Sequence, residues 1–167
     1  MISYEKVRQA LKTSTIVIII LNAISIVLSL IGFAGIFFLQ SQLKNETFRS
    51  QFTTEQLAQL EASLSPFMIF ISVLNLIAIV VILVFCAQNL SNLKKKLVIN
   101  YVPYILGLVL CIVGLATSLF LAPKTASSSS LIFTVVLTLA QAALYGFAFY
   151  KAKTLNEKES DNDQTIL

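Results

Sequence analysis

The chain of 167 residues contains no histidine and no tryptophan, only two cysteines, and few charged side chains. Charged residues make up 12% of it, against about a quarter of an ordinary soluble domain, while hydrophobic residues make up 57%. The lack of histidine excludes histidine-based catalysis and most zinc sites. The composition also excludes a disulfide-rich secreted module, a disordered chain and a soluble single domain. An integral membrane protein remains.

The charges are confined to short segments that separate four long uncharged runs. The runs have 26 to 32 residues each and are Thr13–Leu43, Ala62–Leu93, Leu97–Pro123 and Thr125–Tyr150. An α-helix rises about 1.5 Å per residue, so about 20 apolar residues cross a hydrocarbon core about 30 Å thick. Each run is long enough for one crossing and too short for two. We therefore expect four transmembrane helices, at about residues 14–40, 66–89, 103–122 and 130–151.

A β-barrel is the other structure that satisfies all backbone polar groups within lipid. Its strands would alternate polar and apolar residues over about ten positions, but Ile16–Leu21 and Ile77–Val84 are continuously apolar. The sequence therefore predicts an all-α fold, a polytopic membrane protein with a four-helix transmembrane bundle in residues 1–153. Residues 154–167 are polar and mixed in charge, which predicts a disordered cytoplasmic tail.

Basic residues predict the orientation of the chain. Nine of the twelve lie in the N-terminal arm, the middle loop and the tail: Lys6, Arg8, Lys12, Lys94, Lys95, Lys96, Lys151, Lys153 and Lys158. The positive-inside rule then predicts that both termini are cytoplasmic. The small size, the plain loops and the lack of extracellular cysteines favour a bacterial plasma membrane.

Two segments outside the predicted spans carry helical signals. Residues 1–12 form either a short amphipathic helix on the inner leaflet or an extension of the first membrane helix, and both interpretations stay open. In the first outer loop, Thr53 and Gln56 fit a capping box, which predicts an amphipathic helix over Thr54–Leu64. The apolar face of that helix, Leu57, Leu60 and Leu64, would pack on the bundle or the lipid interface, or else bind a partner.

The boundaries of the second and third spans carry their own signals. Ser65 and Pro66 are typical of an N-cap and a first helical turn, where the second span would begin. Tyr101 and Tyr104 flank another proline and are typical of a membrane interface.

Chemistry-bearing residues are scarce within the spans. Apart from Lys151, the last residue of the fourth span, none holds an Asp, Glu, Lys or Arg. This disfavours proton-coupled transport, because such transporters need an ionisable group inside the membrane. Cys86 and Cys111 form no Cys-x-x-Cys pair and are expected to pack as small apolar groups. We expect no catalytic residue, no cofactor and no metal. The basic residues sit at membrane edges, so we expect no nucleic-acid partner either.

Polar and small residues within the spans are the remaining candidates. Asn22, Asn75 and Gln141 could line a polar path, although such groups more often form hydrogen bonds between helices. Small residues let helix backbones approach closely and predict contact faces within the bundle or with a partner. They are Gly32, Gly35, Gly107, Gly114, Ala142 and Gly146.

These observations favour a small non-enzymatic protein that acts as an accessory or partner subunit of a larger membrane complex of the transporter, secretion or immunity type. Its partners would be the lipid bilayer and another membrane protein, or itself as a homo-oligomer. The alternative is a homo-oligomeric small channel or uniporter with an uncharged polar path. A third possibility, an enzyme acting on lipid, would need Glu46, Glu55 and Glu61 to gather at one membrane edge.

Overall fold

The computed structural model describes residues 4–120 and 128–164, most of which are helical. The helices are α1 (Tyr4–Gln42), α2 (Glu46–Arg49), α3 (Thr54–Ser63), α4 (Pro66–Lys95), α5 (Val102–Phe120) and α6 (Ser128–Gln164). The fold is the predicted all-α bundle. Its long helices α1, α4, α5 and α6 are each apolar enough to cross a membrane, which indicates a multi-pass membrane protein.

The number and order of the predicted spans are confirmed, but the helices exceed them at several ends. α1 begins at Tyr4, so the basic arm extends the first membrane helix and forms no separate surface helix. α4 continues past the predicted end at residue 89 to Lys95, where Lys96 in the left-handed conformation (φ 59°) terminates it. The predicted end of the third span, at residue 122, lies outside the described residues.

α6 continues beyond residue 153, where the sequence predicted a disordered tail. In the structure, residues 154–164 are helical, and 165–167 lie outside the described residues. Leu155 is fully buried, and the Asn156 side chain donates to Ile99 O at 2.9 Å and accepts from Ile99 N at 3.0 Å. These tertiary contacts hold the start of the extension, and local composition does not encode them.

The predicted helix in the first loop is confirmed as α3. The Thr53 hydroxyl accepts a hydrogen bond from Gln56 N at 3.3 Å, and the Gln56 side chain accepts one from Thr53 N at 3.0 Å, which completes the capping box. Ser65 caps α4 and Pro66 begins it, also as predicted. The sequence did not indicate the single-turn helix α2, which is linked to α3 by the ion pair between Arg49 and Glu61 at 3.0 Å.

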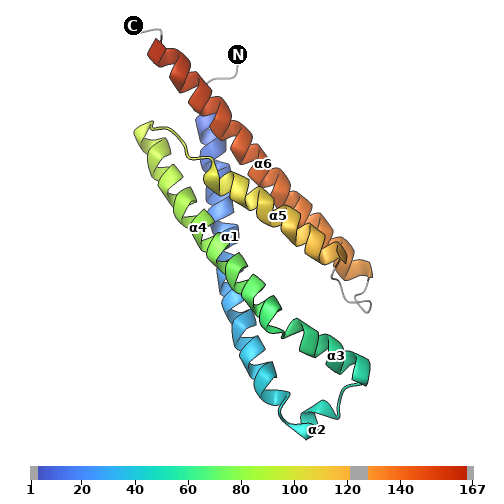
Figure 1. Ribbon diagram of the computed structural model, residues 1–167. Coiled ribbons are helices and arrows are strands. Elements are labelled where there is room, and N and C mark those ends of the chain that lie inside the picture. Colours follow the sequence, from blue (N-terminus) through green and yellow to red (C-terminus); the bar gives the residue numbers. More distant parts are fainter. Residues whose placement is uncertain (1–3, 121–127, 165–167) are drawn as a thin grey trace.

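The four long helices form a ring in which α1 and α5 each pack against α4 and α6. Successive long helices run in opposite directions. Both chain termini and the α4–α5 loop therefore lie at one end of the molecule, and α2 and α3 lie at the other (Figure 1). The segments that contain nine of the twelve basic residues thus share one end.

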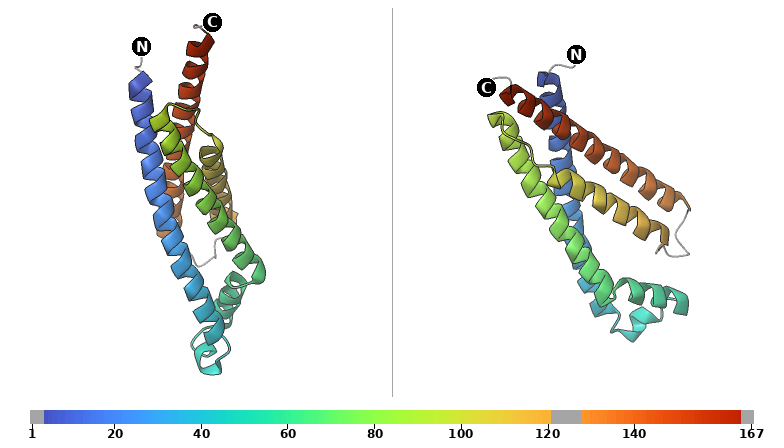
Figure 2. Two further views of the ribbon diagram at one scale, coloured as in Figure 1. Left: turned by 90° about the vertical axis from the view of Figure 1, so that its left-hand side faces the viewer. Right: turned by 45° about the horizontal axis from the view of Figure 1, so that its top comes forward.

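The buried core occupies only the half of the bundle nearest the termini, here called the closed end. Its main side chains come from all four long helices and include Leu11, Ile18, Ile82, Cys86, Tyr104 and Ala148. Among the described residues, no residue of α1 after Asn22 and none of α4 before Ile79 is buried. From there the α1–α4 pair and the α5–α6 pair diverge, and we call this half the open half (Figures 1 and 2).

Candidate functional site

A cavity of about 270 Å³ lies between the four long helices, where the closed end meets the open half. Asn22 of α1, Asn75 of α4 and Gln141 of α6 all line it, so the structure brings the three residues of the predicted polar path to one place. Hydroxyl groups of Ser25, Thr138 and Tyr145 add to its polar surface. The rest of the lining is apolar or small: Ile18, Leu21, Ile79, Gly107, Leu110, Cys111, Gly114 and Leu144.

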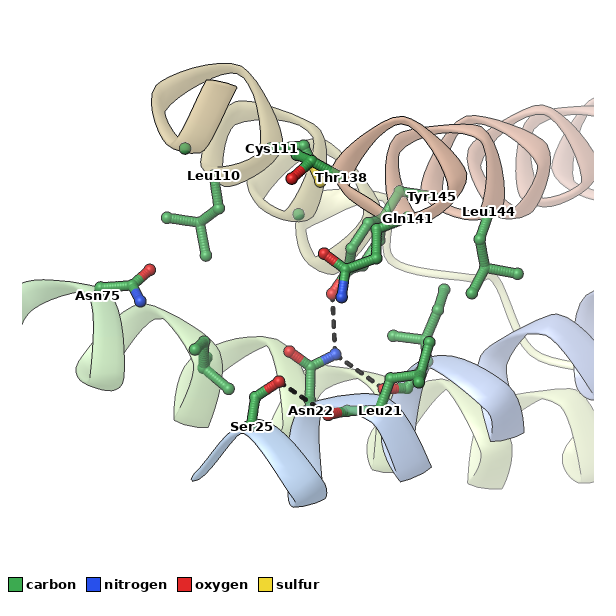
Figure 3. Close-up of a pocket in the computed structure, with 14 residues that line it drawn as sticks. Leu21, Asn22, Ser25, Asn75, Leu110, Cys111, Thr138, Gln141, Leu144 and Tyr145 are labelled. Atoms are coloured by element: carbon green, nitrogen blue, oxygen red, sulfur yellow. Dashed lines mark hydrogen bonds between the residues drawn. The ribbon is translucent and has the colours of Figure 1, made fainter. Parts of the chain in front are cut away.

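Asn22 is held in place by two hydrogen bonds. Its Nδ2 donates to Ile18 O within α1 and to Tyr145 Oη of α6, both at 2.8 Å. Figure 3 shows Asn22 reaching from α1 toward Gln141 and Tyr145 on the facing helix. The bond to Tyr145 joins two helices, so Asn22 fits the alternative interpretation of span polar residues as interhelical links. The Oδ1 atom of the same side chain accepts no hydrogen bond from the described residues, and Asn22 lines the cavity.

Asn75 and Gln141 differ from Asn22 because neither side chain forms a hydrogen bond within the described part of the chain. Asn75 is exposed and Gln141 is half-buried, and both line the cavity. Each amide carries two N–H donors and a carbonyl acceptor. At membrane depth, no bulk water is present to satisfy such groups, so an unpaired amide there is costly. The two amides therefore favour a polar occupant of the cavity.

The cavity lining contains no Asp, Glu, Lys or Arg. An ion would lose its hydration there without gaining a compensating charge, which is costly in a low-dielectric site. The lining can form neutral hydrogen bonds on one part of its surface and apolar contacts on the rest. Chemically, the site suits an uncharged group with hydrogen-bonding capacity, and it holds no base or nucleophile activated by a charged neighbour.

Two buried tyrosines organise the closed end, and sequence reasoning missed both. Tyr104, predicted to lie at a membrane interface, is instead fully buried. Its Oη forms a hydrogen bond with Thr15 Oγ1 at 2.8 Å and accepts another from Asn89 Nδ2 at 3.3 Å. Tyr145 holds Asn22, as described above. The available signal was a tyrosine inside the third and the fourth uncharged runs, because a buried phenol needs a hydrogen-bond partner.

Asn89 fastens the loop between α4 and α5. Its Nδ2 donates to Asn100 O at 2.7 Å, and its Oδ1 accepts from Asn100 N at 2.9 Å. These two hydrogen bonds satisfy both the backbone N–H and the backbone C=O of Asn100, as pairing with another backbone segment would. Asn156 does the same for Ile99 from α6. The sequence signal was the asparagines themselves, which are unfavourable in helix interiors unless their side chains are used.

The predicted small-residue contacts divide into two groups. At Gly107 an added Cβ would overlap the ring of Tyr145, so α5 and α6 approach each other there only because the residue is glycine. Ala142 is half-buried against the core. At the other four glycines, an added Cβ would meet no other described residue within 4 Å, so the structure shows no close approach that requires glycine there; they are Gly32, Gly35, Gly114 and Gly146.

The remaining predicted residues lie away from the cavity, except Cys111. Leu64 is buried, whereas Leu57 and Leu60 on the same face of α3 are half-buried. Cys86 and Cys111 are free, buried thiols. The three loop carboxylates, Glu46, Glu55 and Glu61, are exposed. Within the described ranges, no three acidic, cysteine or histidine residues form a group that could hold a metal ion. The carboxylate cluster that a lipid-acting enzyme would need is therefore not supported.

No family of known proteins, no curated protein and no solved structure matches this chain at a significant level.

Proposed function

We propose that the protein is a small non-enzymatic membrane protein that acts as an accessory or partner subunit of a larger membrane complex. In the open half, large apolar side chains of both helix pairs are accessible. Lipid chains can cover an apolar surface of this kind, so the exposure alone does not favour a protein partner.

The observation that carries the proposal is the position of two glycines in the open half. Gly32 and Gly35 of α1 leave open space where a side chain would stand. Glycine costs a helix about 1 kcal/mol relative to alanine, and no other described residue packs closely at the Cβ position of these two. In membranes, small residues with open space beside them are typical of helix–helix contacts. A helix of another subunit would make use of the notch at Gly32 and Gly35.

The test is recovery of partners in several mild detergents, with mass spectrometry of the co-purified proteins. Gly32→Leu should fill the notch and reduce recovery of a specific partner or of a homo-oligomer. Gly146→Leu is the matched control, since that glycine also has open space but lies at the closed end. Recovery of a single monodisperse protein from every detergent would contradict the proposal.

A second candidate function rests on the cavity. Asn22, Asn75 and Gln141 come from three helices and line one uncharged space, as a homo-oligomeric channel or uniporter with a polar path would require. Hydroxyl and amide groups without charge can conduct a neutral solute.

Purified protein in liposomes should then carry a flux of water or of a small neutral solute, measured by light scattering after an osmotic step. Asn75→Leu should reduce this flux severalfold, because it removes an amide from the path. Ser72→Ala is the control on the same helix, since Ser72 bonds its own helix at Met68 O and lies outside the cavity. Permeability equal to that of empty liposomes would remove this candidate.

A further inference from the structure

The cavity has more hydrogen-bonding capacity than the protein itself uses. Within the described part of the chain, the amides of Asn75 and Gln141 form no hydrogen bond, and Asn22 Oδ1 accepts none. Tyr145 Oη accepts from Asn22 and keeps its own proton available to donate. Donors and acceptors therefore face one space together, so a complementary occupant must itself offer both.

The charge of the lining restricts the occupant to an uncharged group. Along the helices, the charged side chains nearest to the lining are Lys12 on α1 and Lys151 on α6, each six residues from the closest lining residue of its helix. Leu21, Ile79 and Leu110 form part of the apolar wall. A phosphate or ammonium headgroup would enter without a counter-charge, whereas hydroxyl and ester carbonyl groups need only hydrogen bonds.

The position of Asn75 shows how an occupant would enter. Asn75 is exposed and lies in the interior of α4, well inside the span Pro66–Lys95, so the cavity opens at the depth of the bilayer. Figure 3 shows Asn75 on the opposite side of the space from Gln141 and Tyr145. The volume of about 270 Å³ is just under the range of about 300–1,000 Å³ for sites that enclose a whole small molecule. A lipid headgroup would fit, and its chains would stay outside in the open half.

We propose that this cavity binds the headgroup of an uncharged lipid of the diacylglycerol class, which carries one hydroxyl and two ester carbonyl groups. The amide N–H groups of Asn75 and Gln141 and the Tyr145 hydroxyl donate to the carbonyl oxygens. The lipid hydroxyl donates to Asn22 Oδ1. The acyl chains lie against the apolar surfaces of the open half. This inference concerns a lipid ligand and does not depend on a protein partner.

The test uses phosphatidylcholine nanodiscs that contain the full chain and a diacylglycerol probe with a diazirine in its acyl chain. Photolysis should label peptides of α1, α4 or α5 in the open half, and excess unlabelled diacylglycerol should compete. A phosphatidylglycerol probe with the same chain should label much less. Asn75→Leu and Gln141→Leu should each lower the competed labelling about tenfold, the effect expected when hydrogen-bonding groups of the ligand lose their partners.

Gly114→Leu and Gly146→Leu form a matched pair of controls. Both glycines have open space at the Cβ position, but only Gly114 lines the cavity, so Gly114→Leu should abolish labelling and Gly146→Leu should preserve it. Equal labelling by the two probes overturns the proposal, as does unchanged labelling in Gln141→Leu. Loss of labelling in Gln141→Leu with unchanged recovery of a protein partner separates lipid binding from the proposed subunit role.

Discussion

Four asparagines show how the surroundings of one residue type decide its role. Asn89 and Asn156 pair with the backbone of the α4–α5 loop, and Asn22 links α1 to α6 through Tyr145. Asn75 makes no hydrogen bond within the described residues and lines the cavity. Three of the four therefore stabilise the fold, and the unpaired one marks the surface available to a ligand.

Asn89→Ala should lower the stability of the closed end. The substitution removes two bonds to Asn100 and one to Tyr104. It leaves the backbone N–H and C=O of Asn100 unpaired, at a cost of about 1–3 kcal/mol, whereas Tyr104 keeps its bond with Thr15. Denaturant titration in detergent, followed by circular dichroism, would measure the change in the free energy of unfolding. Asn92→Ala is the control, because Asn92 makes a single exposed bond to Val98 O at 3.2 Å. Equal losses in the two variants would contradict the role assigned to Asn89.

At the scale of the helices, length separates the part that crosses the membrane from the part that projects. α1 has 39 residues and α6 has 37, which correspond to about 58 Å and 56 Å of helix, against a hydrocarbon core of about 30 Å. Both helices are therefore longer than a crossing of the hydrocarbon core requires. Uncharged runs located the spans, but the extra turns follow from contacts such as those of Leu155 and Asn156 with the rest of the closed end.

Asn156→Leu should loosen the extension of α6 and the α4–α5 loop together. The variant removes both bonds to Ile99, so amide hydrogen exchange should become about tenfold faster at Ile99 and at residues 154–157. Hydrogen-exchange mass spectrometry would detect this. Glu157→Gln should change exchange by less than about twofold, since it removes only an exposed ion pair with Lys153 at 3.7 Å. Unchanged protection in Asn156→Leu would show that other contacts hold the extension.

At the scale of the whole molecule, stability is concentrated at one end. The core and the networks around Tyr104 and Asn89 all lie at the closed end, while the open half contributes pairwise helix contacts and accessible apolar surface. This division leaves the two helix pairs separate where the cavity opens. The candidate site thus lies at the border between a packed region and an unpacked one.

Matched isoleucines on α4 test this division. Ile82 is fully buried at the closed end, whereas Ile77 is 54% exposed. Ile82→Ala should destabilise the protein by about 2–4 kcal/mol through the cavity that it creates, and Ile77→Ala by less than about 1 kcal/mol. Unfolding in mixed micelles with increasing denaturing detergent would compare the two. Similar losses would indicate that a partner or lipid packs against the open half as closely as the core does.

Local signals in the sequence explain what could be predicted. The uncharged runs located four membrane helices, the Thr53–Gln56 capping box located α3, and Ser65 and Pro66 located the start of α4. Each of these features depends on residues that are close in sequence. The extension of α6 and the burial of Tyr104 depend on contacts between distant segments, so neither could be predicted from the local sequence.

The sequence by itself determined the fold class, the number of membrane helices and the identity of Asn22, Asn75 and Gln141 as exceptional polar residues, because hydrophobicity and capping act locally. Only the tertiary structure decided that these three residues share one cavity, that Gly107 is packed while Gly32 is not, and that the core fills one end. The physical reason is that apolar membrane helices look alike along the chain. Their relative placement depends on interhelical hydrogen bonds and close packing, which exist only once the helices meet.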